Sequence, residues 1–419
     1  MSGLWRRAFS PLDDELALLP GTLTLRLQES LVRLVTHIPS FAKASQEVAW
    51  LTGAHVHPDT ARRHTEAAGA VLVAHETAEA ARILREHPAP PCAPDTLLFS
   101  VNGAMIPLVH GQWTEVRTLA VGEVQPATPT AAGPVVRTTQ RSSFSRRVDS
   151  STFSDVATLE LHRRGIEGAR RVGVVVDGAD WRQTFVDYQY PDAVRILDFP
   201  HAAEHVTPIA ACAAEVNVRL PAATLAATGV TLSPEDPAAW RQVLKHGGPA
   251  ALLPALRATV AAQPTNQELV TRLSYLEARV AQMQYPQFIA DGWPIGSRMV
   301  ESANKLVVED RLKGAGMHWA DQNVNPLLAL RNAVCNDRWE ECWTVIAREQ
   351  RRAVWVKRQR QRATRQAARA PAALPPVPAP PEPVPPPAPT PPAASDAKPV
   401  HPWHRPWSVR RQRELVGAA

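Results

Sequence analysis

The chain has 419 residues, 45% of them hydrophobic, and a formal net charge of +6. This length suffices for two or three domains around a sizeable hydrophobic core. Its apolar runs are shorter than the roughly 18 residues that cross a bilayer, its N-terminus lacks the apolar segment of a signal peptide, and its four cysteines form no C-x-x-C pair. The composition thus gives no support to a membrane protein, a disulfide scaffold or a zinc ribbon, and we expect a cytoplasmic protein.

The first segment, residues 1–95, has the pattern of a helical DNA-binding domain. Ser45–Leu51 predicts a short helix, Gly53 a turn, and Pro58–Ala68 a longer helix with its proline in the first turn, where proline is tolerated. This is the order of a helix-turn-helix. Arg62 and Arg63 would lie on its second helix, within reach of DNA phosphates or base edges. Helical hairpins with glycine turns also occur in proteins that bind no DNA, and this alternative stays open.

Strand patterns dominate residues 96–205. Apolar runs predict strands at Leu97–Gly103, Thr114–Val124, Val135–Phe144, Val172–Asp177 and Val194–Asp198, with helices near Val156–Arg164 and Trp181–Tyr188. The fourth run ends on Asp177, and Gly178 follows it. Because an unpaired buried charge is costly, a carboxylate at the tip of an apolar strand favours a metal-binding or catalytic role.

Helical patterns return after these strands. Residues 206–290 are rich in Ala and Leu, with helical stretches at Ala239–Lys245 and Gln267–Met283, and residues 291–345 begin with a helix near Ser297 that carries Glu301. The order of elements is that of an α/β ribonuclease-H-like core interrupted by an all-helical insertion. In that fold, acids from the first strand, the fourth strand and a late helix meet around two divalent cations.

The last segment, residues 346–419, is basic and rich in proline. From Arg348 to the C-terminus there are 14 Lys and Arg against 4 Asp and Glu, so the rest of the chain is net negative. Arg348–Arg369 predicts a basic helix, and Pro371–Pro406 predicts extended, disordered polyproline. Such a tail binds phosphates without sequence preference, or it is a solvated charge run with no partner.

Three literal strings resemble one family of DNA transposases. They are "FSPLDDELALLPG" (9–21), "LDFPHAAEHV" (197–206) and "VESANKLVVEDRLKGAGMHW" (300–319). They resemble bacterial insertion-sequence transposases of the ISKra type, relatives of the Mutator-like DDE transposases, from about Phe9 to Asn336. Asp198-x-x-His201 also matches the Asp-or-Cys-x-x-His signature of the Mutator-like group. Relatives carry a Cys-pair segment upstream of the first string, so we expect a truncated or alternative start.

The resemblance implies a set of site residues. The second catalytic acid falls at Asp177 and the third at Glu301, and these two would hold Mg²⁺ or Mn²⁺ in a two-metal site. The first catalytic position falls at Asn102, where the family has Asp. His201 is expected to contact DNA or to order the catalytic loop, and a purely structural histidine is the competing interpretation.

The amide at residue 102 predicts impaired catalysis. Hard cations prefer anionic oxygen, and two-metal catalysis needs carboxylates to neutralise the pair of cations. Asp95 lies seven positions upstream of Asn102 and is a poor substitute. Asn102 precedes Gly103, and such pairs can deamidate to Asp, so slow partial rescue is a second hypothesis. An ordinary turn asparagine is the structural alternative.

Further cations near the third acid are candidates for DNA binding. Glu301 and Lys305 are four residues apart and would share a helix face, so Lys305 either holds a DNA phosphate or forms a surface salt bridge. Arg311 and Lys313 precede Gly314 and are predicted to face phosphates at a helix end.

His201, Glu204 and His205 match the H-x-x-E-H pattern of inverted zinc peptidases. Such a site needs a third ligand on a suitable helix, and the sequence offers no candidate. We therefore do not expect zinc chemistry.

The sequence thus predicts a DNA transposase that binds insertion-sequence ends as a homo-oligomer at the nucleoid, with metal-dependent strand cleavage and transfer impaired by Asn102. The alternative is a non-cutting DNA-binding regulator derived from a transposase. A weaker alternative is a structure-specific nuclease on the same fold.

Overall fold

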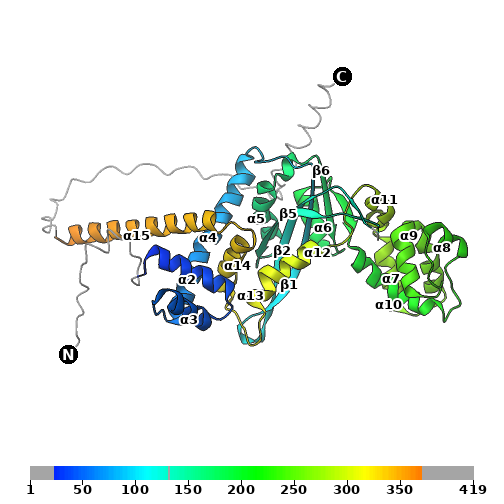
Figure 1. Cartoon of the computed structure of the whole chain (residues 1–419), viewed down its shortest axis with the longest axis horizontal. Helices are drawn as coiled ribbons and strands as arrows, with labels where there is room; N and C mark the ends of the chain where they lie inside the picture. The colour runs from blue at the N-terminus through cyan, green and yellow to red at the C-terminus, as the bar shows by residue number, and fades with distance from the viewer. Residues whose placement is uncertain (1–22, 131–132, 370–419) are drawn as a thin grey trace, which may run out of the picture. The chain divides into compact units, whose positions relative to one another are not determined.

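The computed structural model describes residues 23–130 and 133–369. The protein is an α/β protein with N-terminal helices, a mixed five-stranded sheet and a helical C-terminal region (Figure 1). Residues 26–346 form one compact unit, which therefore includes the segments predicted as 96–205, 206–290 and 291–345. The string at residues 9–21 and the proline-rich stretch at 371–406 lie outside the described residues. The predicted basic helix, Arg348–Arg369, forms the C-terminal part of α15 (Trp339–Arg369).

The N-terminal helices follow the predicted order. They are α2 (Leu25–His37), α3 (Phe41–Thr52) and α4 (Pro58–Glu86). Gly53 ends α3 with a φ of 72°, a left-handed conformation that glycine adopts without steric cost. α4 is longer than the predicted Pro58–Ala68, because Gly69 does not break it. A Cβ at Gly69 would lie 2.1 Å from the Pro326 carbonyl oxygen, so this glycine allows two backbones to pack closely.

The main sheet has the strand order β5-β2-β1-β6-β7. Its strands are β1 (Thr96–Pro107), β2 (Trp113–Val124), β5 (Thr138–Arg146), β6 (Arg171–Val176) and β7 (Val194–Leu197), and β3 (Thr128–Thr130) with β4 (Gly133–Val135) forms a separate two-stranded sheet. β2 pairs antiparallel with β1 and β5, whereas β6 pairs parallel with β1 and β7. The five predicted strand regions are confirmed.

The end of the first strand was also predicted wrongly. The first strand was expected to close on Asn102 before Gly103, but β1 continues to Pro107. The reason is tertiary pairing, since β2 stays in register with β1 as far as the Pro107–Trp113 pair. Asn102 therefore lies within the strand, opposite Thr118.

Helices cover both faces of the sheet. On one face are α5 (Ser150–Arg163) and α6 (Asp180–Gln189), where the Phe185 ring lies 6.3 Å from Phe99 and 5.6 Å from Phe153 between centroids. On the other face are α12 (Arg298–Ala303), a π-helical segment (Asn304–Glu309), α13 (Asp310–Leu312) and α14 (Asp321–Cys335). Ile106 of β1 joins Val307 and Leu328 in the apolar cluster on that face.

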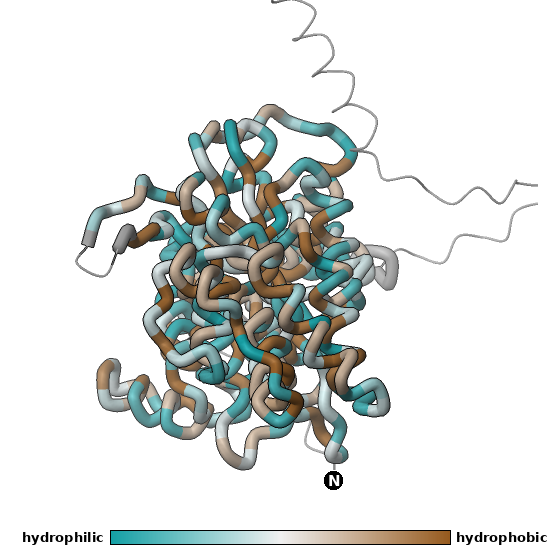
Figure 2. Tube along the Cα trace, turned by 90° about the vertical axis from the view of Figure 1, so that its right-hand side faces the viewer, coloured by the Kyte–Doolittle hydropathy of each residue, from teal (hydrophilic) through white to brown (hydrophobic). Residues whose placement is uncertain are grey.

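The predicted helical insertion lies between β7 and α12. It contains α7 (Phe199–Ala213), α8 (Ala222–Thr228), α9 (Pro237–Ala261), α10 (Gln267–Glu277), a 3-10 turn (Val280–Met283) and α11 (Tyr285–Ala290). Apolar and polar positions alternate along these helices, which face the viewer in Figure 2. Their buried residues, including Trp240 and Tyr285, join Leu98 and Val175 of the sheet in one apolar cluster. The insertion and the sheet therefore share a core.

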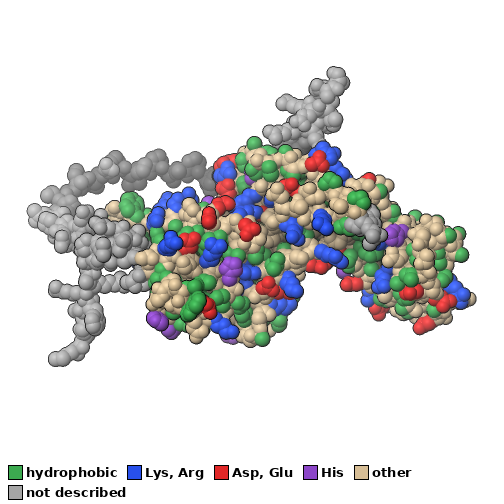
Figure 3. Space-filling view, viewed as in Figure 1, with side chains coloured by type: hydrophobic (Ala, Val, Ile, Leu, Met, Phe, Trp, Pro, Cys, Tyr) green, Lys and Arg blue, Asp and Glu red, His purple; other side chains and the backbone are tan. Residues whose placement is uncertain are grey.

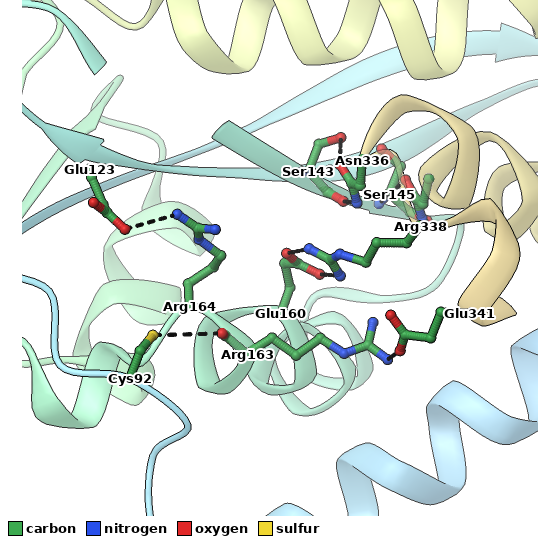
Figure 4. A network of polar contacts seen from close by, with 11 residues as sticks. Cys92, Glu123, Ser143, Ser145, Glu160, Arg163, Arg164, Asn336, Arg338 and Glu341 are labelled. Carbon is green, nitrogen blue, oxygen red and sulfur yellow. Dashed lines mark hydrogen bonds and ion pairs between the residues drawn. The ribbon is translucent and has the colours of Figure 1, made fainter. Parts of the chain in front are cut away.

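Asparagine side chains cover the free edge of β5. Three pairs are formed, Asn336 with Ser143, Asn332 with Ser145, and Asn325 with Arg147. In each pair the backbone N–H donates to the amide oxygen and the amide nitrogen donates to the carbonyl, at 2.7 to 3.2 Å. Figure 4 shows the first pair beside the buried ion pair of Glu160 and Arg338. These side chains thus make the hydrogen bonds that a further strand would make, and they block edge-to-edge association with another sheet.

None of the helices within the described ranges is both long and apolar enough to cross a bilayer.

Candidate functional site

Three of the predicted site residues lie in one row across neighbouring parallel strands. β1 and β6 pair with an offset of 75 residues, from Thr96–Arg171 to Phe99–Val174. The pairing ends there, and the same offset carried three residues further brings Asn102 level with Asp177, which directly follows β6. β6 and β7 pair with an offset of 21, up to Val176–Leu197, so Asp198 comes next in the row. The backbone N–H of Asp198 donates to the Val176 carbonyl at 2.9 Å, which extends this pairing.

A guanidinium joins the first two members of the row. Arg182, in the first turns of α6, donates from Nη2 to Oδ1 of Asn102 at 2.7 Å, and its Nη1 forms an ion pair with Oδ1 of Asp177. The Arg182 side chain is 9% exposed and that of Asp177 is 26% exposed. Asp177 also accepts the backbone N–H of Ala179 at 3.1 Å, which starts α6. The carboxylate of Asp177 thus accepts a hydrogen bond from the start of α6 and forms an ion pair with Arg182.

Arg182 is held in place by its surroundings. Its guanidinium carbon lies 5.2 Å from the centroid of the Trp181 ring, and the guanidinium of Arg117 lies at the same distance from that ring. Burial lowers the pKa of Arg182, while Glu115 and Tyr275 act in the opposite direction. Arginine nevertheless stays protonated in proteins, so this group is a fixed buried cation at neutral pH.

Asp198 links the row to the helix that carries Glu301. Its Oδ1 accepts the backbone N–H of Ser297 at 2.7 Å, and its Oδ2 accepts the backbone N–H of His201 at 3.1 Å. Burial raises the pKa of Asp198, and Glu301 raises it further, while the two backbone N–H donors act against this. The Ser297 hydroxyl donates to Oε1 of Glu301 at 2.8 Å. Glu301 therefore joins the site beside Asp198.

The helical insertion closes over the turn that follows Asp177. The backbone N–H of Gly178 donates to the Tyr275 hydroxyl at 2.9 Å, and Nη2 of Arg279 donates to the Gly178 carbonyl at 2.7 Å. The Arg279 guanidinium also lies 3.9 Å from the centroid of the Tyr275 ring. Burial raises the pKa of Tyr275, so its hydroxyl is neutral at physiological pH. Two residues about 100 positions away thus fix the backbone beside the row.

The two histidines of the H-x-x-E-H match lie against the same tyrosine. The His205 ring is stacked on Tyr275 with centroids 3.9 Å apart, and the His201 ring meets Tyr275 edge-on at 5.7 Å. Burial lowers the pKa of His205 to about 4, and the positive charges of His201, Arg272 and Arg279 contribute. His205 is therefore neutral at physiological pH and packs as an aromatic ring.

The predicted DNA contacts near Glu301 differ in accessibility. Lys305 and Lys313 are exposed, and Lys313 pairs with Glu309 at 3.3 Å. Glu301 and Lys305 form no ion pair within the described residues, because Glu301 accepts from Ser297 and Lys305 belongs to the π-helical segment. Figure 3 shows Lys and Arg side chains gathered on the face where α12 lies.

The prediction that Arg311 faces phosphates does not fit the structure. Its side chain is fully buried, with the guanidinium 5.3 Å from the Phe41 ring centroid and 5.2 Å from that of Trp319, and Nε donates to the Val35 carbonyl at 3.1 Å. Burial lowers the pKa of Arg311 to about 10. Arg311 therefore joins the N-terminal helices to the core and does not reach solvent.

The two N-terminal arginines predicted to bind DNA, Arg62 and Arg63, lie on the first turns of α4. Arg62 pairs with Asp59 at 3.4 Å and with Glu66 at 3.0 Å, so its charge is balanced within the helix. Arg63 donates from Nε to the Asp59 carbonyl and from Nη2 to the Thr60 hydroxyl, both at 3.3 Å, and has no carboxylate partner among the described residues. Of the two, Arg63 carries the less neutralised charge.

Sequence reasoning missed Arg182, Tyr275 and Arg279. A search for acids passes over Arg182, although it lies five residues after Asp177, at the start of the next helix. Tyr275 lies in the last turn of α10 and Arg279 in the turn that follows it, and their spacing of four residues is also typical of ordinary surface pairs. Only the pairing of α10 with the Gly178 turn distinguishes them.

The donor set of the row does not fit a divalent cation as it is arranged. Asn102 is neutral, the charge of Asp177 is matched by Arg182, and both carboxylate oxygens of Asp198 accept backbone N–H groups. Among the residues that the structure describes, no three Asp, Glu, His or Cys side chains are placed to hold one metal ion. The Mg²⁺ or Mn²⁺ site at Asp177 and Glu301 stays a prediction.

No protein-family model matches the chain, and no curated protein sequence matches it.

Proposed function

We propose that this protein is a DNA-binding protein on a transposase scaffold with a ribonuclease-H-like core, which binds insertion-sequence ends while strand cleavage is impaired. The strand order supports this proposal. Three strands pair antiparallel, two more continue the sheet in parallel, and the helical insertion separates Asp177 from Glu301. This is the arrangement that the resemblance to DDE transposases implies.

The observation that carries the proposal is the position of Asn102 opposite Asp177. In the proposed scaffold these are the first and second catalytic positions, and here they are bridged by one guanidinium. A pair of cations about 3.5–4 Å apart needs several anionic oxygens to offset its charge. An amide, a carboxylate and an arginine together carry no net negative charge. Cutting is therefore impaired, whereas the fold and its DNA-facing cations are retained.

DNA binding would use exposed cations at two places. Lys305 and Arg298 are exposed beside Glu301, and Arg63 lies on the second helix of the helix-turn-helix. Such cations bind phosphates through counterion release, which makes affinity fall steeply with salt. Base contacts from the N-terminal segment of α4 would add preference for the element ends. Binding as a homo-oligomer on paired ends belongs to the same proposal.

An active transposase and a structure-specific nuclease are the competing functions. Both require a centre that holds divalent cations, and the contact of Arg182 with Asn102 and Asp177 favours the non-cutting regulator over both.

The test uses the full chain and two duplexes of equal length, one with the insertion-sequence ends and one with the same bases in scrambled order. Fluorescence anisotropy between 50 and 200 mM salt measures binding, and denaturing gels with Mg²⁺ or Mn²⁺ measure nicking. We expect tighter binding to the ends and no metal-dependent nicking. Metal-dependent nicking by the native chain would show an active enzyme. Equal affinity for both duplexes would refute recognition of the element ends, and no measurable binding to either duplex would refute the DNA-binding role.

A further inference from the structure

We propose that Arg182 is a built-in cation that takes over the charge-neutralising role of a divalent ion, so that Asn102 and Arg182 act as a matched pair that keeps the centre metal-free. This inference rests on the proposed scaffold. It goes beyond impairment by Asn102 alone, because Arg182 is the second residue that prevents metal binding. Both residues must be replaced before a metal can bind.

The geometry of Arg182 is that of an ion between two ligands. Its two terminal nitrogens reach one oxygen on each neighbouring strand, Oδ1 of Asn102 at 2.7 Å and Oδ1 of Asp177 in an ion pair. Asn102 and Asp177 lie three residues beyond the last pair of β1 and β6, and the two contacts of Arg182 bring their Oδ1 atoms to the same guanidinium. A guanidinium presents several N–H donors in a fixed plane, so it can bridge two oxygens as a metal would.

The charges of the bridged pair also balance without a metal. Arg182 supplies one positive charge and Asp177 one negative charge, and Asn102 supplies none. Asp198 and Glu301 are the acids that remain beside this pair. Arg117, the other cation on the Trp181 ring, is paired with Glu115 at 2.9 Å. A divalent cation placed here would meet a buried positive charge only 9% exposed to solvent, and water screens such repulsion poorly.

The pairing predicts that restoring the acid is insufficient. An Asp at residue 102 would add a charge-assisted hydrogen bond to Arg182 and hold it more firmly. Removal of the guanidinium alone would leave one carboxylate and one amide, a weak pair of ligands for a hard cation. Only the two changes together would leave two carboxylates on adjacent strands with no resident cation between them.

The experiment compares the full-length native chain with Asn102→Asp, Arg182→Gln and the double variant. Mn²⁺ binding is measured by electron paramagnetic resonance of the free ion, with circular dichroism as the test of folding. We expect the native chain and both single variants to leave Mn²⁺ free at concentrations of about 100 µM, and the double variant to bind Mn²⁺ at concentrations at least about tenfold lower. The matched control is Asn102→Asp with Arg195→Gln, which removes an arginine paired with Asp187 elsewhere on the sheet. This control should bind no better than Asn102→Asp alone.

Two results would overturn the inference. Tight Mn²⁺ binding by Asn102→Asp with Arg182 intact would show that the arginine does not prevent metal binding. Asn and Asp have the same shape, so this single variant keeps the geometry of the site. Absence of binding by a folded double variant would show that the row is not a latent metal site. If the double variant does not fold, Asn102→Asp with Arg182→Met replaces it. Methionine carries no charge and occupies much of the space of the arginine stem, so this variant should bind Mn²⁺ more tightly than Asn102→Asp, and equal binding would again refute the proposal. DNA binding by the native chain is measured in parallel, so failure of the proposed function is seen separately.

Discussion

The Tyr275 hydroxyl accepts a hydrogen bond of 2.9 Å from the backbone N–H of Gly178, a residue 97 positions earlier in the chain. Arg279, one turn further along, binds the Gly178 carbonyl. The backbone N–H and the backbone carbonyl of Gly178 are thus both hydrogen-bonded by side chains of the helical insertion. The insertion therefore does more than pack beside the sheet, since it fixes the turn from which Asp177 and Arg182 extend.

Substitution of Gly178 by alanine should release this turn. An added Cβ would lie 2.1 Å from Nε of Arg279 and 2.3 Å from the Tyr275 hydroxyl, so both side chains would have to move and give up their hydrogen bonds. We expect a loss of about 1–3 kcal/mol in the free energy of unfolding, measured with urea. Gly296→Ala is the control, because its nearest neighbour would be Oδ1 of Asp198 at 4.0 Å. Equal stability of the two variants would contradict the role assigned to Gly178.

Asn332 should be essential for the free edge of β5. Its side chain satisfies both the N–H and the carbonyl of Ser145, at 3.1 and 3.2 Å, and these groups are buried. Asn332→Ala leaves both without a partner, so we expect a loss of about 2–4 kcal/mol in urea unfolding and greater self-association of the exposed strand. Gln322→Ala, an exposed change on the same helix, should leave stability nearly unchanged. An Asn332→Ala protein as stable as this control would refute the pairing.

His205 should make the protein less stable in acid. Its pKa is about 4 in the folded protein, against 6.5 for an unperturbed histidine. Between these values the unfolded chain binds more protons, so the free energy of unfolding contributed by His205 is fully present above pH 6.5 and falls as the pH falls toward 4. His205→Phe keeps an aromatic ring on Tyr275 but cannot titrate. Urea unfolding at pH 7, 6 and 5 should give a smaller decline for this variant, and identical declines would exclude the assignment.

Substitution of Lys305 and of Arg311 by alanine should affect DNA binding and stability separately. Lys305 is exposed, so Lys305→Ala should weaken DNA binding without loss of stability and reduce the slope of log affinity against log salt by about 1. Arg311 is buried between two aromatic rings, so Arg311→Ala should lower the unfolding free energy by about 2 kcal/mol or more and leave the salt slope of the folded protein unchanged. Anisotropy titrations and urea curves on both variants test this, and a reversal of the two effects would disprove it.

The sequence by itself determined the strands and the position of Asp177. Val172–Asp177 and Val194–Asp198 are short apolar runs bounded by glycine or polar residues, and such local patterns need no distant partner to be recognised. The tertiary structure alone decided how far β1 extends, because β2 continues the pairing beyond Asn102. It also decided the burial and the binding partners of two arginines. Arg311 is buried by Phe41 and Trp319, and Arg182 is bound by Asn102 on the neighbouring strand. The physical reason is that the environment of a charged side chain is set by residues far away in the chain, whereas the pattern of an apolar strand is contained in its own few residues.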